Sequence, residues 1–130
     1  MKLVLDTHVF LWYIAADPLI PVAYRDAIRD PANEVYLSAA SVWEAVIKHA
    51  LGKLPLPESP AVLLPRERVA HGILTLPVNE TEMQQLARLP ALHRDPFDRI
   101  LVAQALHYGL TILTVDNALK AYPAPILPAI

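Results

Sequence analysis

Residues 2–6, KLVLD, are the stretch that decides the fold class. Three aliphatic residues follow Lys2 without interruption, and a carboxylate comes directly after them. Residues 110–116, LTILTVD, repeat this arrangement near the other end of the chain. Near-continuous apolar runs of this length are typical of strands that helices cover on both faces, as in the parallel sheets of α/β proteins. We therefore expect two strands that are covered on both faces, each with an acidic side chain at its end.

Strand patterns and helix patterns alternate between these two runs. Strands are expected at residues 2–5, 34–37, 71–76 and 110–115, with a last short strand at 125–127. Helices are expected at residues 7–15, 17–29, 61–70, 79–89 and 97–108 and within 38–52, with a helical turn at 117–121. The alternation predicts an α/β domain with a mostly parallel central sheet of four to five strands, flanked by helices.

Local signals predict several helix ends. Asp17 and Pro18 are typical of a helix start, with the acid as N-cap and the proline at the first helical position, so the helix to residue 29 is expected to begin there. Asn79 and Glu82 have the spacing of a capping box. Gly109 is typical of the residue that ends a helix.

The segment 38–52, SAASVWEAVIKHALG, carries an amphipathic pattern. Trp43, Val46 and Ile47 recur at helical spacing, and we interpret this stripe as a face that packs into the core. Gly52 is expected to end the helix.

Length and composition limit the classes of protein to consider. The 130 residues predict one domain, 1–130. With 55% hydrophobic and 18% charged residues the chain can bury a core, which excludes intrinsic disorder. Its three glycines are isolated, so glycine-rich phosphate-binding loops are excluded. The absence of cysteine excludes disulfide scaffolds, thiolate zinc sites and cysteine nucleophiles.

Charge and hydropathy indicate where the protein acts. No stretch reads as a membrane span or as a signal peptide, so we expect a soluble cytoplasmic protein. The formal net charge is −2, which gives no global basic field for attracting nucleic acid. If the protein acts on nucleic acid, a local feature must bind it.

Four acidic residues hold positions that chain direction brings to one edge of the sheet. Asp6 and Asp116 directly follow strands, and Glu44 lies in the first turns of the helix after the second strand. Asp98 lies in the first turn of the helix before the fourth strand. In a right-handed crossover this helix begins at the same edge of the sheet. Four carboxylates at one edge repel each other unless a cation neutralises them.

Oxygen ligands of this kind favour a hard cation such as Mg²⁺ or Mn²⁺. Such an ion activates water and stabilises the charge that develops when a phosphodiester is cleaved. The four acids therefore predict a metal site for phosphodiester chemistry.

Each acid taken singly also has a structural interpretation. Asp6 and Asp116 are each placed to cap the helix or turn that follows. Glu44 is spaced for an i,i+4 ion pair with Lys48. The sequence DPFD is a typical helix start with Asp95 as its N-cap. The coincidence of all four at one sheet edge favours the metal site.

Other polar residues near the acids are secondary candidates. Thr7 and Thr114 are expected to support the acids by hydrogen bonds. Three residues that flank Asp98 are candidates for positioning a phosphate: His93, Arg94 and Arg99. Lys48 and Lys53 are candidates for the mouth of the site, although the sequence favours a place on the surface.

Four segments together resemble the motifs of PIN-domain ribonucleases, and in detail the VapC-type toxins of toxin–antitoxin pairs. They are LVLDTHVFLW, LSAASVWEAVIKHALGKL, HRDPFDRILVAQAL and LTILTVDNALKAY, in order along the whole chain. The resemblance implies a PIN-like three-layer fold, and metal-binding acids at Asp6, Glu44, Asp98 and Asp116. It also implies endonucleolytic cleavage of RNA with Mg²⁺ or Mn²⁺, a homodimer, and a cognate antitoxin that blocks the site.

The resulting hypothesis is metal-assisted hydrolysis of RNA by a toxin of a toxin–antitoxin pair. Asp6, Asp98 and Asp116 would bind one or two divalent ions, and Glu44 would complete the cluster or orient the attacking water. A haloacid-dehalogenase-like phosphohydrolase is an alternative, although His8 stands where that chemistry needs a second acid. A non-catalytic binding or phospho-receiver domain is another, although paired acids after the first strand are missing.

Overall fold

The two apolar runs form neighbouring parallel strands, the first inside the sheet and the second at one edge. The computed structural model describes residues 1–92 and 95–130. Its four strands are β1 (Lys2–Leu5), β2 (Glu34–Ser38), β3 (Leu74–Leu76) and β4 (Thr111–Leu113), all parallel, in the order β3-β2-β1-β4. In register, Leu3 of β1 lies between Val35 and Thr111. The predicted parallel sheet is therefore confirmed.

Helices connect the strands in the predicted alternation. They are α1 (Thr7–Ile14), α2 (Val22–Arg29), α3 (Ala39–Ala50), α4 (Pro60–Ala70), α5 (Met83–Arg88) and α6 (Pro96–Tyr108), with 3₁₀ turns η1 (Glu80–Glu82) and η2 (Asn117–Ala121). No helix in the described ranges is long and apolar enough to cross a membrane.

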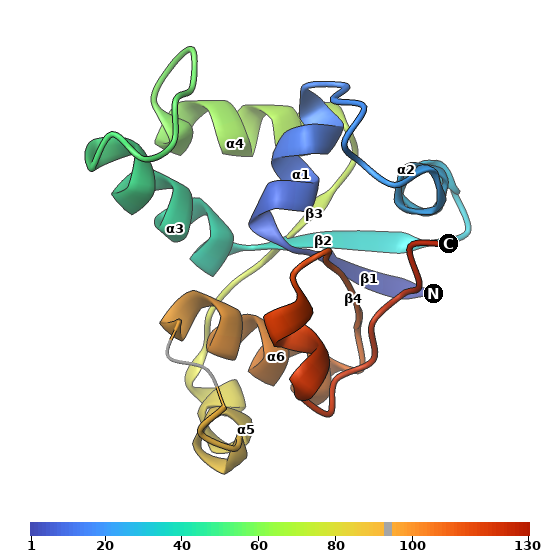
Figure 1. Ribbon diagram of the computed structural model, residues 1–130, viewed down its shortest axis with the longest axis vertical. Coiled ribbons are helices and arrows are strands. Elements are labelled where there is room, and N and C mark those ends of the chain that lie inside the picture. Colours follow the sequence, from blue (N-terminus) through green and yellow to red (C-terminus); the bar gives the residue numbers. More distant parts are fainter. Residues whose placement is uncertain (93–94) are drawn as a thin grey trace.

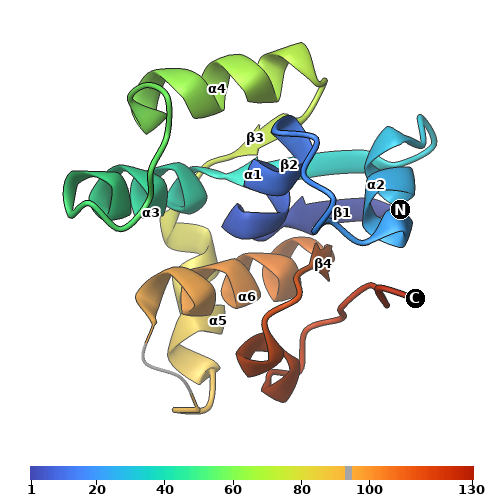
Figure 2. The ribbon, with the colours of Figure 1, turned by 45° about the horizontal axis from the view of Figure 1, so that its top comes forward.

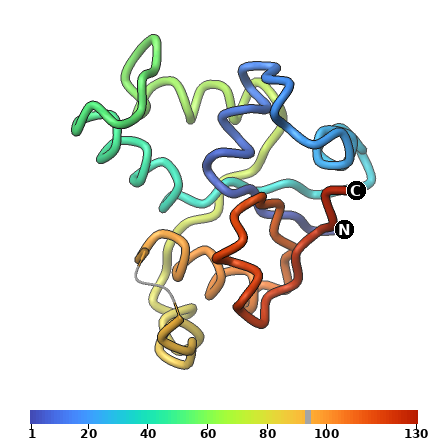
Figure 3. Tube along the Cα trace, in the orientation of Figure 1, coloured from blue at the N-terminus to red at the C-terminus, as the bar shows by residue number. Residues whose placement is uncertain are grey.

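The helices cover both faces of the sheet and make three layers. In Figures 1 and 2, α1, α2 and α4 lie on one side of the sheet, whereas α5, α6 and η2 lie on the other. Side chains of β1 alternate accordingly, because Leu3 and Leu5 pack with the first group of helices and Val4 packs with the second. This layering confirms the predicted three-layer architecture. Both chain ends lie on the side of the molecule away from α3 (Figure 3).

The predicted helix start at Asp17 and Pro18 is wrong. α2 begins at Val22, and Asp17 instead closes a turn by accepting hydrogen bonds from the backbone N–H groups of Leu19 and Ile20. Pro21 explains the difference, because it has no N–H to donate within a helix and restricts the residue before it.

The outer strands are shorter than predicted. The expected strand 71–76 is reduced to β3 because α4 is capped by His71, whose N–H donates to the Glu67 carbonyl, and Gly72 then turns with a positive φ of 67°. The expected strand at 125–127 is a single bridge beside β4, in which Ile126 pairs with Ile112.

The face that α3 buries is not the predicted one. Trp43 is 61% exposed and Val46 is also exposed, whereas Ser41, Glu44 and Ala45 are buried. The spacing correctly predicted a helix. Its buried face carries small and acidic side chains, because this face packs next to α1 and the edge of the sheet. Interpreting the Trp43 stripe as core was therefore wrong.

Candidate active site

One pocket at the carboxyl ends of the strands gathers the acids singled out from the sequence. Its lining residues are Asp6, His8, Trp12, Glu44, Lys48, Asp95, Asp98, Val115 and Asp116. The ends of β1 and β4, the beginnings of α1 and α6 and the middle and second half of α3 converge there. Parallel strands end at a common edge. All four predicted metal-binding acids therefore share one pocket.

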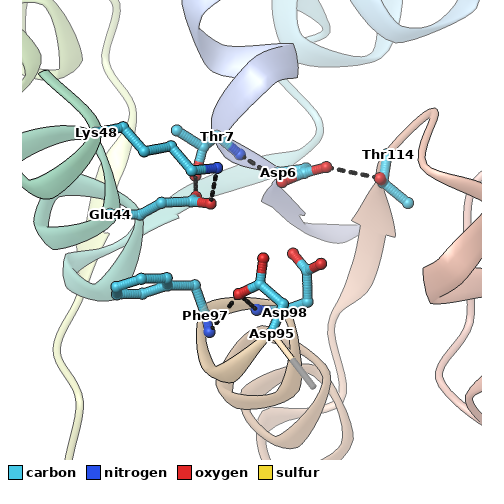
Figure 4. Close-up of polar contacts among 8 residues, drawn as sticks. All are labelled: Asp6, Thr7, Glu44, Lys48, Asp95, Phe97, Asp98 and Thr114. Carbon is cyan, nitrogen blue, oxygen red and sulfur yellow. Dashed lines mark hydrogen bonds and ion pairs between the residues drawn. The ribbon is translucent and has the colours of Figure 1, made fainter. Parts of the chain in front are cut away.

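Asp6 is buried and is fully hydrogen-bonded at the end of β1. It is 8% exposed, its Oδ1 accepts from the Thr7 N–H at 2.7 Å, and its Oδ2 accepts from Thr114 Oγ1 at 2.7 Å (Figure 4). Burial raises the pKa of Asp6, as does the charge of Glu44, although the hydrogen bond from Thr114 lowers it. Asp6 thus caps α1 and also presents a destabilised charge to the pocket.

Thr114 is itself held in place through its backbone. The Tyr24 hydroxyl lies 2.9 Å from the Thr114 carbonyl oxygen and 2.7 Å from that of Leu127, and donates toward both. Burial raises the pKa of Tyr24, which keeps the phenol protonated as a donor. The end of β4 is therefore fixed to α2 and to the C-terminal segment.

Glu44 faces the pocket from α3, with both of its oxygens engaged. It is 4% exposed, and its Oε1 accepts from Thr7 Oγ1 at 2.6 Å, while its Oε2 accepts from Lys48 Nζ at 2.7 Å (Figure 4). Thr7 therefore links the two acids, because its N–H donates to Asp6 and its hydroxyl donates to Glu44.

Lys48 lines the pocket, so it takes the less favoured of its two predicted places, the mouth of the site. Its side chain is 36% exposed and pairs with Glu44 one helical turn away. Burial alone lowers the pKa of Lys48, but the hydrogen bond and charge of Glu44 and the charges of Asp95 and Asp98 outweigh it and raise that pKa above its ordinary value. Lys48 is therefore a fixed positive charge in the pocket. Lys53 is exposed, as expected.

The first turn of α6 supplies two more carboxylates. Asp95 is the predicted N-cap, and its Oδ1 accepts from the N–H groups of Phe97 at 2.9 Å and Asp98 at 3.3 Å. Asp98 is buried, and Figure 4 shows both acids directed from α6 toward Asp6. The sequence had assigned Asp95 to capping alone, whereas it also lines the pocket.

Asp116 lies at the exposed rim of the pocket. Its Oδ1 caps η2 by accepting from the Ala118 N–H at 2.9 Å, and its own N–H donates to Thr114 Oγ1 at 3.1 Å. Among the four acids it is the most exposed to solvent.

Among the three residues expected to position a phosphate, only Arg99 lies in the described part of the chain, and it does not reach the pocket. Arg99 is not among the lining residues; its guanidinium donates to the Pro90 carbonyl at 2.8 Å and to the Tyr122 hydroxyl at 3.3 Å. His93 and Arg94 lie outside the described residues. Thr7 and Thr114 do contact acids, as expected.

His8 and Trp12 also line the pocket, and the sequence reasoning missed them. Their rings meet edge to face with centroids 6.3 Å apart. The signal that could have found them is their i,i+4 spacing on a helix that begins beside Asp6.

The chemistry of the lining fits a hard divalent cation. Five carboxylates face one histidine and one lysine, which leaves excess negative charge in partly buried surroundings. Within the described residues, however, no three acidic or histidine side chains stand close enough to enclose an ion as they are. Carboxylate donors are therefore present, and Asp6 and Asp98 are both buried.

Comparison with known proteins identifies the family. The PIN domain family matches residues 3–125. Ribonuclease VapC22 of Mycobacterium tuberculosis is 27% identical over 124 residues, which cover 93% of this chain and 92% of VapC22. Ribonuclease VapC16 of the same organism is 49% identical over 55 residues, which cover 42% of this chain and only 39% of VapC16.

Solved structures share the fold. VapBC2 from Rickettsia felis, bound to a promoter DNA fragment, superposes with a TM-score of 0.72 at 16% identity over 98% of both chains. FitAcB from Neisseria gonorrhoeae superposes with a TM-score of 0.62 at 24% identity, over 98% of this chain and 97% of that one. The resemblance noted from the sequence is confirmed, and the chain belongs to the PIN domain family.

Proposed function

We propose that this protein is a Mg²⁺- or Mn²⁺-dependent endoribonuclease that acts as the toxin of a toxin–antitoxin pair. The proposal rests on one observation. Asp6, Glu44 and Asp98 are all buried, and they line the same pocket of a PIN domain. The names of the relatives, VapC16 and VapC22 ribonucleases, support RNA as the substrate.

The roles of the residues follow from their surroundings. Asp6 and Asp98 would hold the ion, with Asp116 at the rim as a further ligand. When bound, the ion supplies an activated water and offsets charge on the phosphate. Glu44 is held by Thr7 and Lys48 and keeps unused lone pairs on its oxygens, so it is placed to orient the attacking water. Thr114 fixes the orientation of Asp6.

An antitoxin is the expected partner, and a homodimer is the expected assembly. Solved structures of similar fold include VapBC and FitAB complexes, which supports a partner of this kind for the present chain. The family likeness favours the nuclease over a phosphohydrolase, in which position 8 would need an acid rather than a histidine.

The test is cleavage of RNA by paired variants. Asp6→Asn and Asp98→Asn keep the size of each side chain and remove its charge, and each should reduce cleavage in Mg²⁺ by at least about a hundredfold. Asp26→Asn, which alters an exposed acid on α2, is the matched control and should cleave like the parent. Circular dichroism checks folding. Undiminished cleavage by folded Asp6→Asn and Asp98→Asn would refute the metal site, and a parent inert toward RNA with Mg²⁺ or Mn²⁺ would refute the nuclease.

A further inference from the structure

The carboxylates that line the pocket repel the phosphates of RNA, and a divalent ion alone does not offset this repulsion. RNA carries a negative charge at every phosphate, and the pocket wall presents the carboxylates of Asp6, Asp95 and Asp98 among others. Among the residues described in the lining, Lys48 is the only lysine or arginine. Two arginines were expected to fill this role: Arg99 is hydrogen-bonded elsewhere, and Arg94 lies outside the described residues.

Lys48 is also held in a defined position. Glu44, one turn earlier on α3, anchors its ammonium at 2.7 Å. Glu44 itself cannot swing away easily, because it is buried and its other oxygen accepts from Thr7 Oγ1. A lysine has three N–H donors, and Glu44 accepts from one. The side chain therefore reaches the pocket with donors to spare and with part of its surface open to solvent.

We propose that Lys48 is a substrate-binding residue, whose ammonium, anchored by Glu44, contacts a phosphate of the RNA at the pocket. The inference rests on the proposed nuclease function and deepens it. It gives Glu44 a second task, that of positioning Lys48. It also supplies the local positive charge that a chain of net charge −2 lacks globally.

The competing possibility is that Lys48 only neutralises Glu44. In that case RNA binding would be indifferent to Lys48, and its removal would chiefly tighten the binding of divalent ions by freeing Glu44. The two possibilities differ in a quantity that folding does not affect: the salt dependence of RNA binding. Each phosphate contact made by a cation releases counterions, so the slope of log K against log salt falls by about 0.7 per lost contact on single strands.

The experiment measures binding of a fluorescent single-stranded RNA oligonucleotide over a range of KCl concentrations at fixed Mg²⁺. The Asp98→Asn background prevents cleavage. In this background Lys48→Met should weaken binding by about tenfold at low salt and reduce the slope by about 0.7. Lys48→Arg should keep the slope of the Asp98→Asn protein because it keeps the charge. Lys2→Met removes the same charge from the start of β1, at the opposite edge of the sheet, and should change neither quantity.

Several outcomes would overturn the inference. One is an unchanged slope in Lys48→Met and in a second variant, Lys48→Gln, when both are folded by circular dichroism. Another is tighter Mn²⁺ binding, followed by electron paramagnetic resonance, with RNA affinity unaltered. If the parent cleaves RNA while Lys48→Met binds it normally, only the role of Lys48 fails. If the parent neither binds nor cleaves RNA, the proposed function fails together with it.

Discussion

Asp6 shows how one carboxylate serves folding and chemistry together. Its hydrogen bonds from Thr7 and Thr114 cap α1 and join β1 to the end of β4. Its burial, close to Glu44, makes the ionised form costly without a counter-ion. The capping and functional interpretations of this acid are therefore compatible, because the same contacts that cap the helix aim the side chain at the pocket.

The raised pKa of Asp6 predicts how pH affects the metal-free protein. Between the ordinary value of 3.8 and the raised one, the folded state holds a proton that the unfolded chain has lost. The free energy of unfolding therefore falls as pH rises through that window, and the loss persists at neutral pH. Asp6→Asn should raise the metal-free Tm at pH 7 by roughly 2–4 °C and flatten the acid side of the profile. Calorimetry from pH 3 to about pH 8 tests this; a lower Tm in the variant would contradict it.

Divalent ions should offset the loss of folding stability that the buried charge of Asp6 causes. An ion that binds only the folded state adds about 2.7 kcal/mol to the free energy of unfolding when its concentration is about 100 times Kd. Mg²⁺ or Mn²⁺ should therefore raise the Tm of the parent, while Asp6→Asn and Asp98→Asn should lose most of the shift. Asp26→Asn serves as the control at matched ionic strength. An equal shift in all four proteins would mean that the ions bind somewhere else.

At the scale of elements, short signals predicted helix ends well wherever the backbone alone decides. Asp95 caps α6, Gly109 ends it in the left-handed conformation, and Asn79 and Glu82 form the expected capping box. The start at Asp17 failed because Pro21, only a few residues further on, overrides a favourable cap. The prediction of the buried face of α3 failed for another reason. The spacing of apolar residues indicates an amphipathic helix, but the packing partner decides which face is buried.

Glu82 goes beyond its predicted capping role and joins η1 to the middle of α6. It is fully buried, and its carboxylate accepts hydrogen bonds from the Asn79 N–H, the Gln104 amide and the Tyr108 hydroxyl. Sequence spacing revealed the first of these contacts, which is local. The other two depend on tertiary packing between segments more than twenty residues apart, which no local pattern encodes.

Removing Glu82 should therefore be costly although it lies outside the pocket. Glu82→Ala leaves buried donors unsatisfied and a cavity, and should lower the free energy of unfolding by roughly 2–4 kcal/mol. Urea denaturation measures the loss. Glu80→Ala, an exposed acid of the same turn, is the matched control. A loss below about 1 kcal/mol would indicate that solvent replaces the carboxylate without penalty.

At the scale of the whole molecule, the sequence predicted the shared pocket because chain direction alone brings strand ends together. It could not predict that Lys48 lines the pocket or that the Arg99 side chain is directed away from it, because both depend on side-chain packing. It also could not show which apolar side chains lie outside the core. Trp43, Val46 and Leu51 of the α3 segment are exposed large apolar side chains.

Exposed apolar side chains repeated along one helix are typical of a protein interface. Two copies of one helix face can meet about a two-fold axis, and the expected homodimer needs such a surface. We expect the double variant Trp43→Ser, Val46→Ser to shift the protein from dimer to monomer in light scattering after size exclusion, with an unchanged circular dichroism spectrum. Val22→Ser removes an exposed apolar side chain from α2, on the far side of the molecule from α3 (Figure 1), and should leave the dimer intact. A monomeric parent, or a double variant that still dimerises, would show that a different surface or a different partner covers this face.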